Sequence, residues 1–183
     1  MIKRSEYESI KKRAADMMEN AGLVLTEDEM SRLEVTDFGL NNVYQVGLIL
    51  HVYVNTKRYC AKELPMLPGQ ICAEHRHPPI DDTNSGKEET FRCRWGEVYV
   101  NVPGEAAANP KARIPKGKED VYTARHEIVL KAGEQYTMAP NTKHWFQAGP
   151  EGAIVSEFSS HSIDGLDIFT DLEITRFTEI VED

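Results

Sequence analysis

Two histidines one residue apart, His75 and His77, are the first residues of this chain whose types and spacing could do chemistry. They lie in an apolar, strand-like run, and positions i and i+2 of an extended strand point to the same face. A polar loop follows, and the next apolar run opens with Glu88 and Glu89. Imidazole and carboxylate groups that share one interior face are suitable donors for a divalent first-row metal ion. The stretch therefore indicates a metal site, although two surface histidines on an edge strand would give the same pattern.

Alternation along the second of these runs favours one glutamate over the other. With Glu89 facing inward, apolar side chains such as Phe91 and Cys93 also face inward, and the intervening arginines face solvent. With Glu88 inward, those arginines would be buried without partners, which costs far more free energy. The pattern therefore favours Glu89 as the ligand and places Lys87 on the same inner face. Glu88 stays open as the alternative, because an arginine-lined active site would invert the argument.

A third histidine, His144, heads a later apolar run directly after a tight polar turn. Alone, a histidine beside Trp145 and Phe146 would more often be a packed core residue than a ligand. Together with the two earlier histidines and the glutamate, it makes a set of three imidazoles and one carboxylate. Such a set fills four positions of an octahedral metal ion and leaves two for the oxygens of a substrate.

The composition is that of a soluble globular protein with one domain. The chain has 183 residues, of which 40% are hydrophobic and 28% charged, and its N-terminus lacks the apolar segment of a signal peptide. No apolar run approaches the ~20 residues of a membrane helix. A formal net charge of -9 argues against nucleic acid as a partner. Three cysteines within apolar runs indicate reduced thiols in a cytoplasmic protein.

Two helices are expected before the first strand. Ser5 and Glu8 form a capping-box pattern at the start of a helix over residues 5–21, in which apolar residues recur at helical spacing. Thr26 and Glu29 repeat this pattern at the start of a second, short helix.

The rest of the chain reads mainly as short strands. Apolar runs rich in β-branched and aromatic residues recur over residues 43–160, separated by Gly, Pro and Asn turn signals, and predict an all-β antiparallel barrel or sandwich. Residues 104–120 predict a long irregular loop over the barrel mouth. We therefore expect a single domain with a helical lead over residues 1–36, the barrel over 43–160 and a C-terminal arm over 161–183.

The histidine segments resemble the two motifs of the cupin superfamily. Gly69, the pair His75 and His77, Glu89 and Gly96 match the first motif, with a longer loop before the glutamate. The stretch GEQYTMAPNTKH resembles the second motif, although its Pro–His spacing is one residue short and Asn-Thr replaces the usual x-Gly. The resemblance implies a cupin-type antiparallel β-barrel, that is, a double-stranded β-helix or jelly roll.

More specifically, nearly the whole chain resembles the cupin-type D-lyxose isomerases. This resemblance is carried by the blocks EHRHP, GKEETFRCRWG, PNTKHWFQAGPEGAIVSEFSS and DIFTD. It implies a cytoplasmic, homodimeric, manganese-dependent aldose–ketose isomerase that acts on D-lyxose and D-xylulose, with D-mannose and D-fructose as further substrates. The same ligand set also accepts Co2+, Fe2+ or Zn2+.

Isomerisation between C1 and C2 needs a base that moves a proton between the two carbons through an enediol. Glu157 is the strongest candidate, because it is a carboxylate in an otherwise apolar or small strand, where burial would raise its pKa. Lys87 could donate to a substrate oxygen or carry the second proton. A bound metal ion would acidify the proton that the base removes.

Other residues are candidates for contacts with the sugar. Trp145 and Phe91 could form the apolar floor under it, although both are compatible with an ordinary core. The sequence does not choose among the polar candidates, which are Asp167, Asp164, Lys143 and Arg92. The remaining histidines have no ligand spacing and are expected at the surface or behind the ligands; they are His51, His126 and His161.

Two other functions are compatible with the same motifs. A cupin dioxygenase would hold Fe(II) at these ligands in an apolar pocket, whereas Lys87 and Glu157 favour a proton-transfer site. A non-catalytic sugar-binding cupin, like the sensing domains of regulators, would accompany a DNA-binding segment, and the N-terminal helices lack a basic recognition face. The isomerase is therefore the favoured hypothesis.

Overall fold

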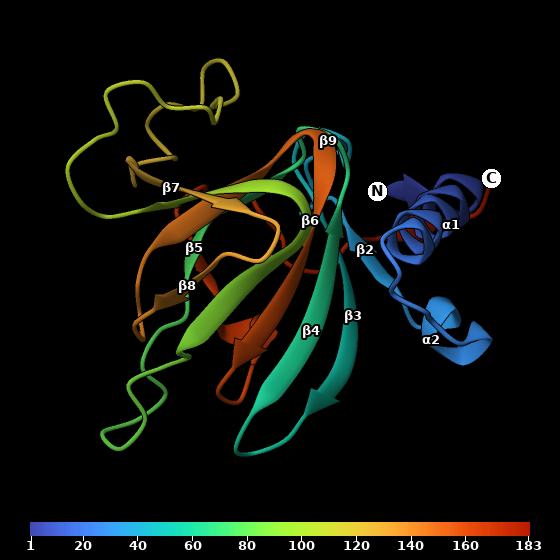
Figure 1. The fold of residues 1–183 in the computed structure, drawn as a ribbon, viewed down its shortest axis with the longest axis horizontal. Helices are drawn as coiled ribbons and strands as arrows, with labels where there is room; N and C mark the ends of the chain where they lie inside the picture. Colours follow the sequence, from blue (N-terminus) through green and yellow to red (C-terminus); the bar gives the residue numbers. More distant parts are fainter.

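The protein, described over residues 1–183 by a computed structural model, is built around a curled antiparallel sheet of nine strands. The sheet closes into a barrel, and two helices lie against one side of it (Figure 1). The prediction of an all-β antiparallel barrel is confirmed. No helix is long and apolar enough to span a membrane. The strands of the barrel are β2 (Glu34–Thr36), β3 (Leu48–Asn55), β4 (Cys60–Met66), β5 (Ile71–Arg76), β6 (Glu89–Val102), β7 (His126–Lys131), β8 (Gln135–Met138), β9 (His144–Ser159) and β10 (Ile168–Phe169).

Strand β9 connects most of the barrel. It pairs with β5 through its first half and with β4 through its second half, while β6 pairs with it along both. Glycine is one of the turn signals expected to separate strands, but the structure has one long strand across Gly96, whose pairing shifts register there. A bulge bends a strand without ending it. Gly96 has a φ of 71°, and a β-carbon there would collide with the carbonyl oxygen of Gly152, so the bend needs glycine.

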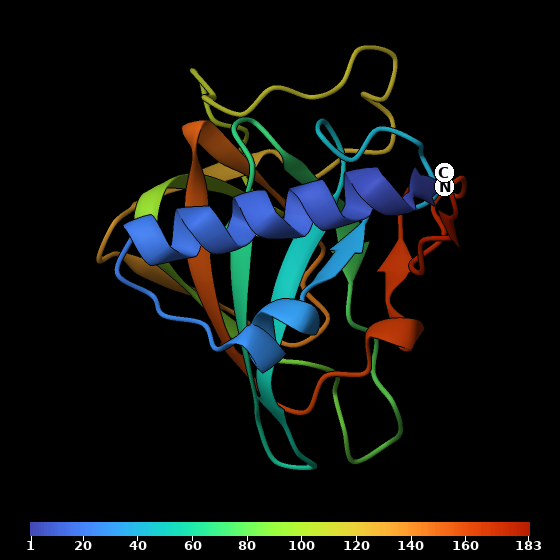
Figure 2. The same ribbon diagram turned by 90° about the vertical axis from the view of Figure 1, so that its right-hand side faces the viewer.

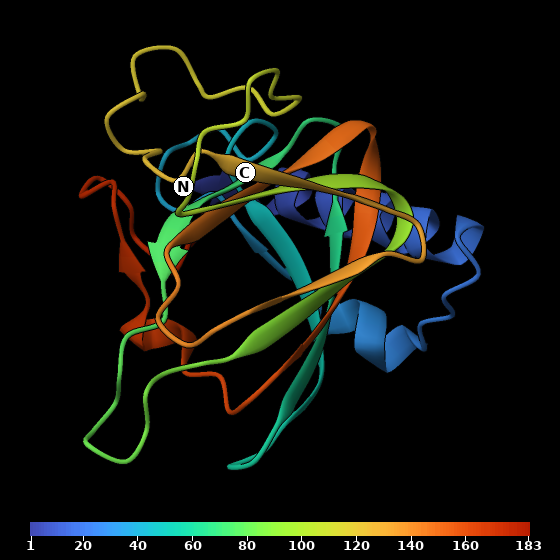
Figure 3. The same cartoon turned by 60° about the vertical axis from the view of Figure 1, so that its left-hand side comes forward.

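The long loop between β6 and β7 leaves the sheet close to His144, because Asn101 near the end of β6 pairs with Trp145. Figures 1 and 3 show this loop extending outside the barrel, well apart from the loop over residues 77–88. No residue of the long loop lines the cavity beside His75 and His77, so the prediction that the loop covers this cavity is wrong. The end of the loop packs instead behind β5, where the Thr123 hydroxyl and the backbone N–H of Ala124 donate to Glu74.

The N-terminal helices occur where they are predicted. Helix α1 (Arg4–Asn20) crosses the outside of the barrel, as Figure 2 shows, and buries Ile10 and Ala14 in an apolar cluster with residues of β2 and β3. The predicted cap at Ser5 is wrong, because the helix begins one residue earlier and the Ser5 hydroxyl donates to Asp183 instead. At helix α2 (Glu27–Ser31) the predicted capping box is present.

The C-terminal arm returns from the barrel to the N-terminus. It contains a short 3-10 helix, η1 (Asp164–Leu166), the strand β10 at the edge of the main sheet, and β11 (Ile180–Val181). Strand β11 pairs in parallel with β1 (Ile2–Lys3), so the two chain ends lie side by side (Figure 2). On its way the arm supplies part of the cavity wall, which makes it a component of the site rather than an appendage.

Candidate active site

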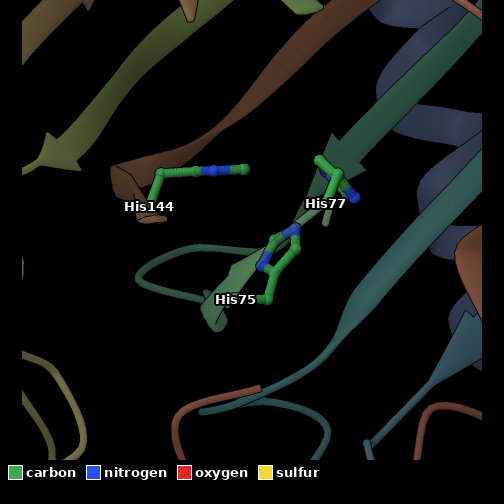
Figure 4. Close-up of side chains that lie close together, drawn as sticks. All are labelled: His75, His77 and His144. Atoms are coloured by element: carbon green, nitrogen blue, oxygen red, sulfur yellow. The ribbon is translucent and has the colours of Figure 1, made fainter. Parts of the chain in front are cut away.

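Three histidines meet at one end of the barrel interior. His75 on β5 lies opposite His144 on β9, because these two residues pair across the strands. His77 is the first residue after the end of β5. One ring nitrogen of each histidine lies within 4.8 Å of the other two, and Figure 4 shows the three rings gathered in one place. All three side chains are buried. The structure thus brings together the three imidazoles that the sequence marks as ligands.

Each ring is held by a hydrogen bond from Nδ1. His75 and His144 donate to the backbone carbonyl two residues earlier in the chain, at 2.8 and 2.9 Å. His77 donates to a carboxylate oxygen of Asp167 at 2.5 Å. In a neutral imidazole the proton on Nδ1 leaves a lone pair on Nε2. The hydrogen bonds therefore fix both the orientation and the tautomer of the rings, as outer partners do for metal-bound histidine.

Glu89 completes a donor set that fits a metal ion. Its Oε1 lies 3.1 Å from Nε2 of His77 and 3.0 Å from Nε2 of His144, yet neither buried nitrogen has a hydrogen-bond partner. Lone pairs that face a carboxylate oxygen repel one another unless a cation lies among them. Burial lowers the pKa of His77, but Glu89 and Asp167 outweigh this and raise it to about 9, so either a second ring proton or a bound cation compensates these carboxylates. The site therefore attracts a cation, and its donors suit a first-row divalent metal.

Lys87 joins Glu89 to a second buried carboxylate, Glu157. Its Nζ lies 2.9 Å from Oε2 of Glu89 and 2.6 Å from Oε1 of Glu157. Burial opposes the charge of Lys87, but the two carboxylates raise its pKa. Burial likewise raises the pKa of Glu89, and the cationic neighbours hold it well below its usual range. Glu157 lines the cavity as predicted, although its immediate neighbour is an ammonium group rather than an apolar side chain.

A second charged cluster lies in the wall of the same cavity. Lys62 on β4 donates to both carboxylate oxygens of Asp164, at 2.8 and 2.9 Å, and Arg176 donates to the same carboxylate at 3.2 Å. Burial raises the pKa of Asp164, but Lys62 and Arg176 lower it further than burial raises it. Arg176 also forms an ion pair with Glu34. We call these four residues the distal cluster.

Sequence reasoning missed two members of the distal cluster that line the cavity. Lys62 stands on the inner face of β4 beside Leu64, so a lysine in an inward position of an apolar strand was the signal that could have identified it. Arg176 lies in the C-terminal arm, far from the motifs, and no local pattern marks it. Asp164, which the sequence offers as one of several polar candidates, does line the cavity.

The comparisons with known proteins agree on one family. A sequence model described as D-lyxose isomerase matches residues 6–183. A D-lyxose ketol-isomerase of Thermofilum sp. is 58% identical over 99% of this chain and 100% of its own length. A D-lyxose/D-mannose isomerase of Thermosediminibacter oceani is 56% identical over 98% of this chain and 99% of its own.

The chain belongs to the D-lyxose isomerase family.

This membership confirms the resemblance seen in the sequence, and with it the expectation of an aldose–ketose isomerase. Among solved structures, the L-ribose isomerase of Cellulomonas parahominis with L-ribose superposes with a TM-score of 0.81 at 18% identity, covering 98% of both chains. That of Acinetobacter sp. DL28 with L-ribose gives 0.80 at 19% identity and the same coverage. At such identities these structures show that the fold is shared and nothing more.

In this D-lyxose isomerase family member, the strand β6 alternates as predicted at its start. Glu89 and Phe91 are buried and line the cavity, whereas Glu88 is exposed. The ring of Phe91 packs edge-on against His144, with 6.1 Å between centroids. The geometry therefore places Glu89, and not Glu88, beside the imidazoles.

Trp145 does not line the cavity, so its predicted place under the sugar is wrong. Neighbouring residues of a strand point to opposite faces, and because His144 points inward Trp145 must point outward. Its indole nitrogen donates to the carbonyl of Ala124 at 2.8 Å, and its ring packs edge-on against Tyr122 of the long loop. Trp145 thus anchors the loop at the far side of the strand.

The remaining polar candidates divide by their side of the barrel. Asp167 lines the cavity and supports His77, while Lys143 and Arg92 are absent from the cavity wall. The expectation that His51 lies at the surface or behind the ligands is wrong, since it is 1% exposed and packs against Tyr53, away from the cavity. The three cysteines are free and buried as expected; they are Cys60, Cys72 and Cys93.

Proposed function

We propose that this protein is a metal-dependent aldose–ketose isomerase that interconverts D-lyxose with D-xylulose and D-mannose with D-fructose. The observation that carries the proposal is a cluster of three histidines and Glu89, in which Lys87 bridges Glu89 to a second buried carboxylate, Glu157. The relatives named D-lyxose ketol-isomerase and D-lyxose/D-mannose isomerase, at 58% and 56% identity, support the choice of sugars.

We infer that His75, His77, Glu89 and His144 hold the metal ion, which we take to be Mn2+, with Co2+, Fe2+ and Zn2+ as alternatives. The fit rests on the converging ring nitrogens, two of which are buried without a hydrogen-bond partner. When bound, a divalent ion polarises the sugar oxygens at C1 and C2 as a Lewis acid and so acidifies the proton on C2.

Glu157 is the proposed base. In the aldose-to-ketose direction its carboxylate takes the proton from C2, which leaves an enediol, and returns that proton to C1. Its Oε1 is fixed from two sides, by Lys87 and by the hydroxyl of Ser159, which donates at 3.1 Å. A carboxylate that is held in place transfers a proton without first reorganising its surroundings.

Lys87 is the proposed carrier of the second proton. Conversion of the aldose to the ketose also requires that the hydroxyl proton of O2 move to O1. Lys87 is buried between two carboxylates, which keep it charged; after its ammonium group has donated a proton to O1, the neutral amine can take the proton of O2. Its contacts with both Glu89 and Glu157 place this donor between the metal site and the base.

In this proposal, the other residues that line the cavity bind the part of the sugar beyond C2. Lys62, Asp164 and Arg176 offer charged donors and acceptors to the hydroxyls beyond C2, and Asp167 offers a further oxygen. Apolar side chains that include Phe91 line the wall between the two charged ends. We also infer that the protein is cytoplasmic, which its free thiols support. We further infer a homodimer, which light scattering of the purified protein tests.

A sugar panel tests the proposed function. Purified protein supplied with Mn2+ is incubated with D-lyxose, D-mannose, D-xylose and D-ribose, and ketose formation is measured for each. We expect the highest rate with D-lyxose and a lower rate with D-mannose. Absence of ketose from all four sugars, in protein that has bound the metal, would refute the proposed isomerase activity. The Fe(II) dioxygenase would then be the favoured hypothesis.

A further inference from the structure

Glu74 is a fully buried carboxylate that the proposed reaction does not use. It lies on β5 next to His75, but its side chain points to the opposite face and is 0% exposed. Its two oxygens accept three hydrogen bonds, from the Thr123 hydroxyl at 2.9 Å, the backbone N–H of Ala124 at 2.7 Å and the Thr170 hydroxyl at 2.7 Å. The carboxylate is therefore saturated by donors from outside its own strand.

These donors belong to two segments far apart in the sequence. One is the end of the long loop, before β7, and the other is the C-terminal arm just after β10. A buried carboxylate is costly unless hydrogen bonds compensate it, and such charge-assisted bonds are short and strong. The nearest cation is Lys143 at 3.8 Å, whose side chain is 39% exposed, so the hydrogen bonds carry most of the compensation. Glu74 thus clamps both segments to β5.

Thr170, which Glu74 holds in place, is close in sequence to two residues that contact the histidines. Thr170 is held by its hydroxyl and also by its backbone N–H, which donates to the Glu74 carbonyl at 3.0 Å. Directly before it, Phe169 lies against His75 with 5.5 Å between ring centroids, and Asp167 accepts the hydrogen bond from His77. Strand β10 pairs with β5 over only two residues, so the Thr170 contacts are a large share of what fixes this part of the arm.

We infer that Glu74 is a positioning residue for the metal site: through Thr170 it holds Asp167 and Phe169 against the histidines. The contact with Thr123, by contrast, anchors the long loop on the outer face of the strand, where Thr123 also accepts a hydrogen bond from the half-exposed Lys143 at 3.1 Å. The inference rests on the proposed function, because it assigns Glu74 a role in orienting ligands of the metal ion. It predicts that the two hydroxyls on one Glu74 oxygen differ in their effect on metal binding.

Thr170→Val and Thr123→Val form a matched pair of variants. Each removes one hydroxyl from the same oxygen of Glu74 at nearly constant volume. The readout is the affinity for Mn2+ of metal-stripped protein, measured by calorimetric titration and independent of activity. We expect Thr170→Val to weaken binding by about 10-fold, the lower end of what outer partners of ligands contribute, and Thr123→Val to change it by less than about 2-fold.

A double-mutant cycle with Asp167→Asn shows whether the effect passes through Asp167. If it does, adding Thr170→Val to the Asp167→Asn variant should change the Mn2+ affinity by less than about 3-fold, because the two changes act on one contact. Thr170→Ser keeps the hydroxyl and should bind Mn2+ like the wild type, which guards against a Thr170→Val variant that folds poorly.

The outcomes separate this inference from the proposed function. Equal affinities of Thr170→Val and the wild type, or equal losses in both valine variants, would overturn the positioning role while the metal site stands. Additive losses in the cycle would overturn the route through Asp167. A wild-type protein that binds no Mn2+ would instead refute the metal site, and the inference with it.

Discussion

The cavity contains two charged clusters, the distal cluster and the group around the histidines. They differ in how fully their positive and negative charges cancel. In the distal cluster two cations, Lys62 and Arg176, face two carboxylates, Asp164 and Glu34, so the charges cancel. At the proposed metal site, Lys87 pairs with Glu89 and Glu157, while a third carboxylate, that of Asp167, contacts His77. When the imidazoles are neutral, the form in which they bind a metal ion, Lys87 and the three carboxylates carry a net charge of −2, which one divalent cation neutralises. The comparison teaches that a buried deficit of charge marks where a cation binds.

The hydrogen bonds of the two places differ in the same way. Lys62 and Asp164 are both satisfied, since Lys62 also donates to the Ser162 hydroxyl at 3.0 Å. At the metal site, Nε2 of His77 and of His144 are buried with no hydrogen-bond partner. A saturated network is a preformed surface that holds a substrate, whereas an unsaturated one needs a ligand to complete it. The four predictions that follow test this difference, from the largest expected effect to the smallest.

Removing the charge of Glu157 should abolish most of the reaction. We expect Glu157→Gln to lower the rate of ketose formation by about 1,000-fold, because a positioned acid–base group contributes about 100- to 10,000-fold. Binding of Mn2+ should persist, since Glu157 is not among the proposed ligands. The measurement is the turnover of saturating D-lyxose.

A matched control for this variant is Glu63→Gln. Glu63 is also buried, on the neighbouring strand β4, but it bonds to the Ser156 hydroxyl on the outer face and does not line the cavity. We expect this variant to keep wild-type turnover to within about 3-fold, as a change away from the reacting atoms should. A Glu157→Gln enzyme as active as Glu63→Gln would show that another group is the base.

Breaking the distal cluster should weaken sugar binding rather than the chemical step. We expect Lys62→Met to raise KM about 10-fold with kcat nearly unchanged, because it removes a contact that is equal in the ground and transition states. It should also lower the free energy of unfolding by about 3 kcal/mol, since it leaves Asp164 short of a partner. A fall in kcat with unchanged KM would contradict the assignment of this cluster to substrate binding.

The contribution of Asp164 to stability should depend on pH with a defined sign. Its pKa in the folded protein is depressed, because the nearby cations outweigh burial. Its stabilisation is therefore complete above the unfolded pKa of about 3.9 and is lost as the pH falls toward the folded value. We expect the difference in unfolding free energy between the wild type and Asp164→Asn to be about 2 kcal/mol at pH 7. In urea titrations this difference should shrink below about pH 4; a difference that grows there would contradict the pairing.

The smallest effect is expected at Glu88. The side chain of Glu88 is exposed, and its backbone N–H donates to the Ser160 hydroxyl at 3.1 Å. Glu88→Gln should change neither Mn2+ affinity nor turnover by more than about 2-fold, as is usual for surface substitutions. A loss of metal binding in this variant would mean that Glu88, not Glu89, is the ligand in the working enzyme.

Much of the site follows from strand periodicity, which sequence shows directly. The spacing of His75 and His77, and the alternation that turns Glu89 inward, need only the two-residue repeat of a strand. The same rule applied to Trp145 would have turned it away from the sugar once His144 was placed inside, so that error was avoidable. The ends of strands were harder to predict, because glycine occurs both at bulges within a strand and at turns between strands.

The parts of the site that depend on the C-terminal arm could not be predicted. Arg176 reaches the cavity only because the arm folds back along the barrel, and Asp167 supports His77 only because β10 pairs with β5. These are long-range pairings between segments of weak local pattern. The role inferred for Glu74 is hidden for the same reason, since its partners lie in two distant segments.

The most direct test of the account is a titration of metal-stripped protein with Mn2+, in which bound metal and ketose formation from D-lyxose are measured together. The single cluster of three histidines predicts that activity rises in proportion to bound metal and saturates at one ion per chain. Ketose formation by the stripped protein at the full rate, or a saturated site without any ketose, would contradict the central claim that this cluster holds the metal for isomerisation.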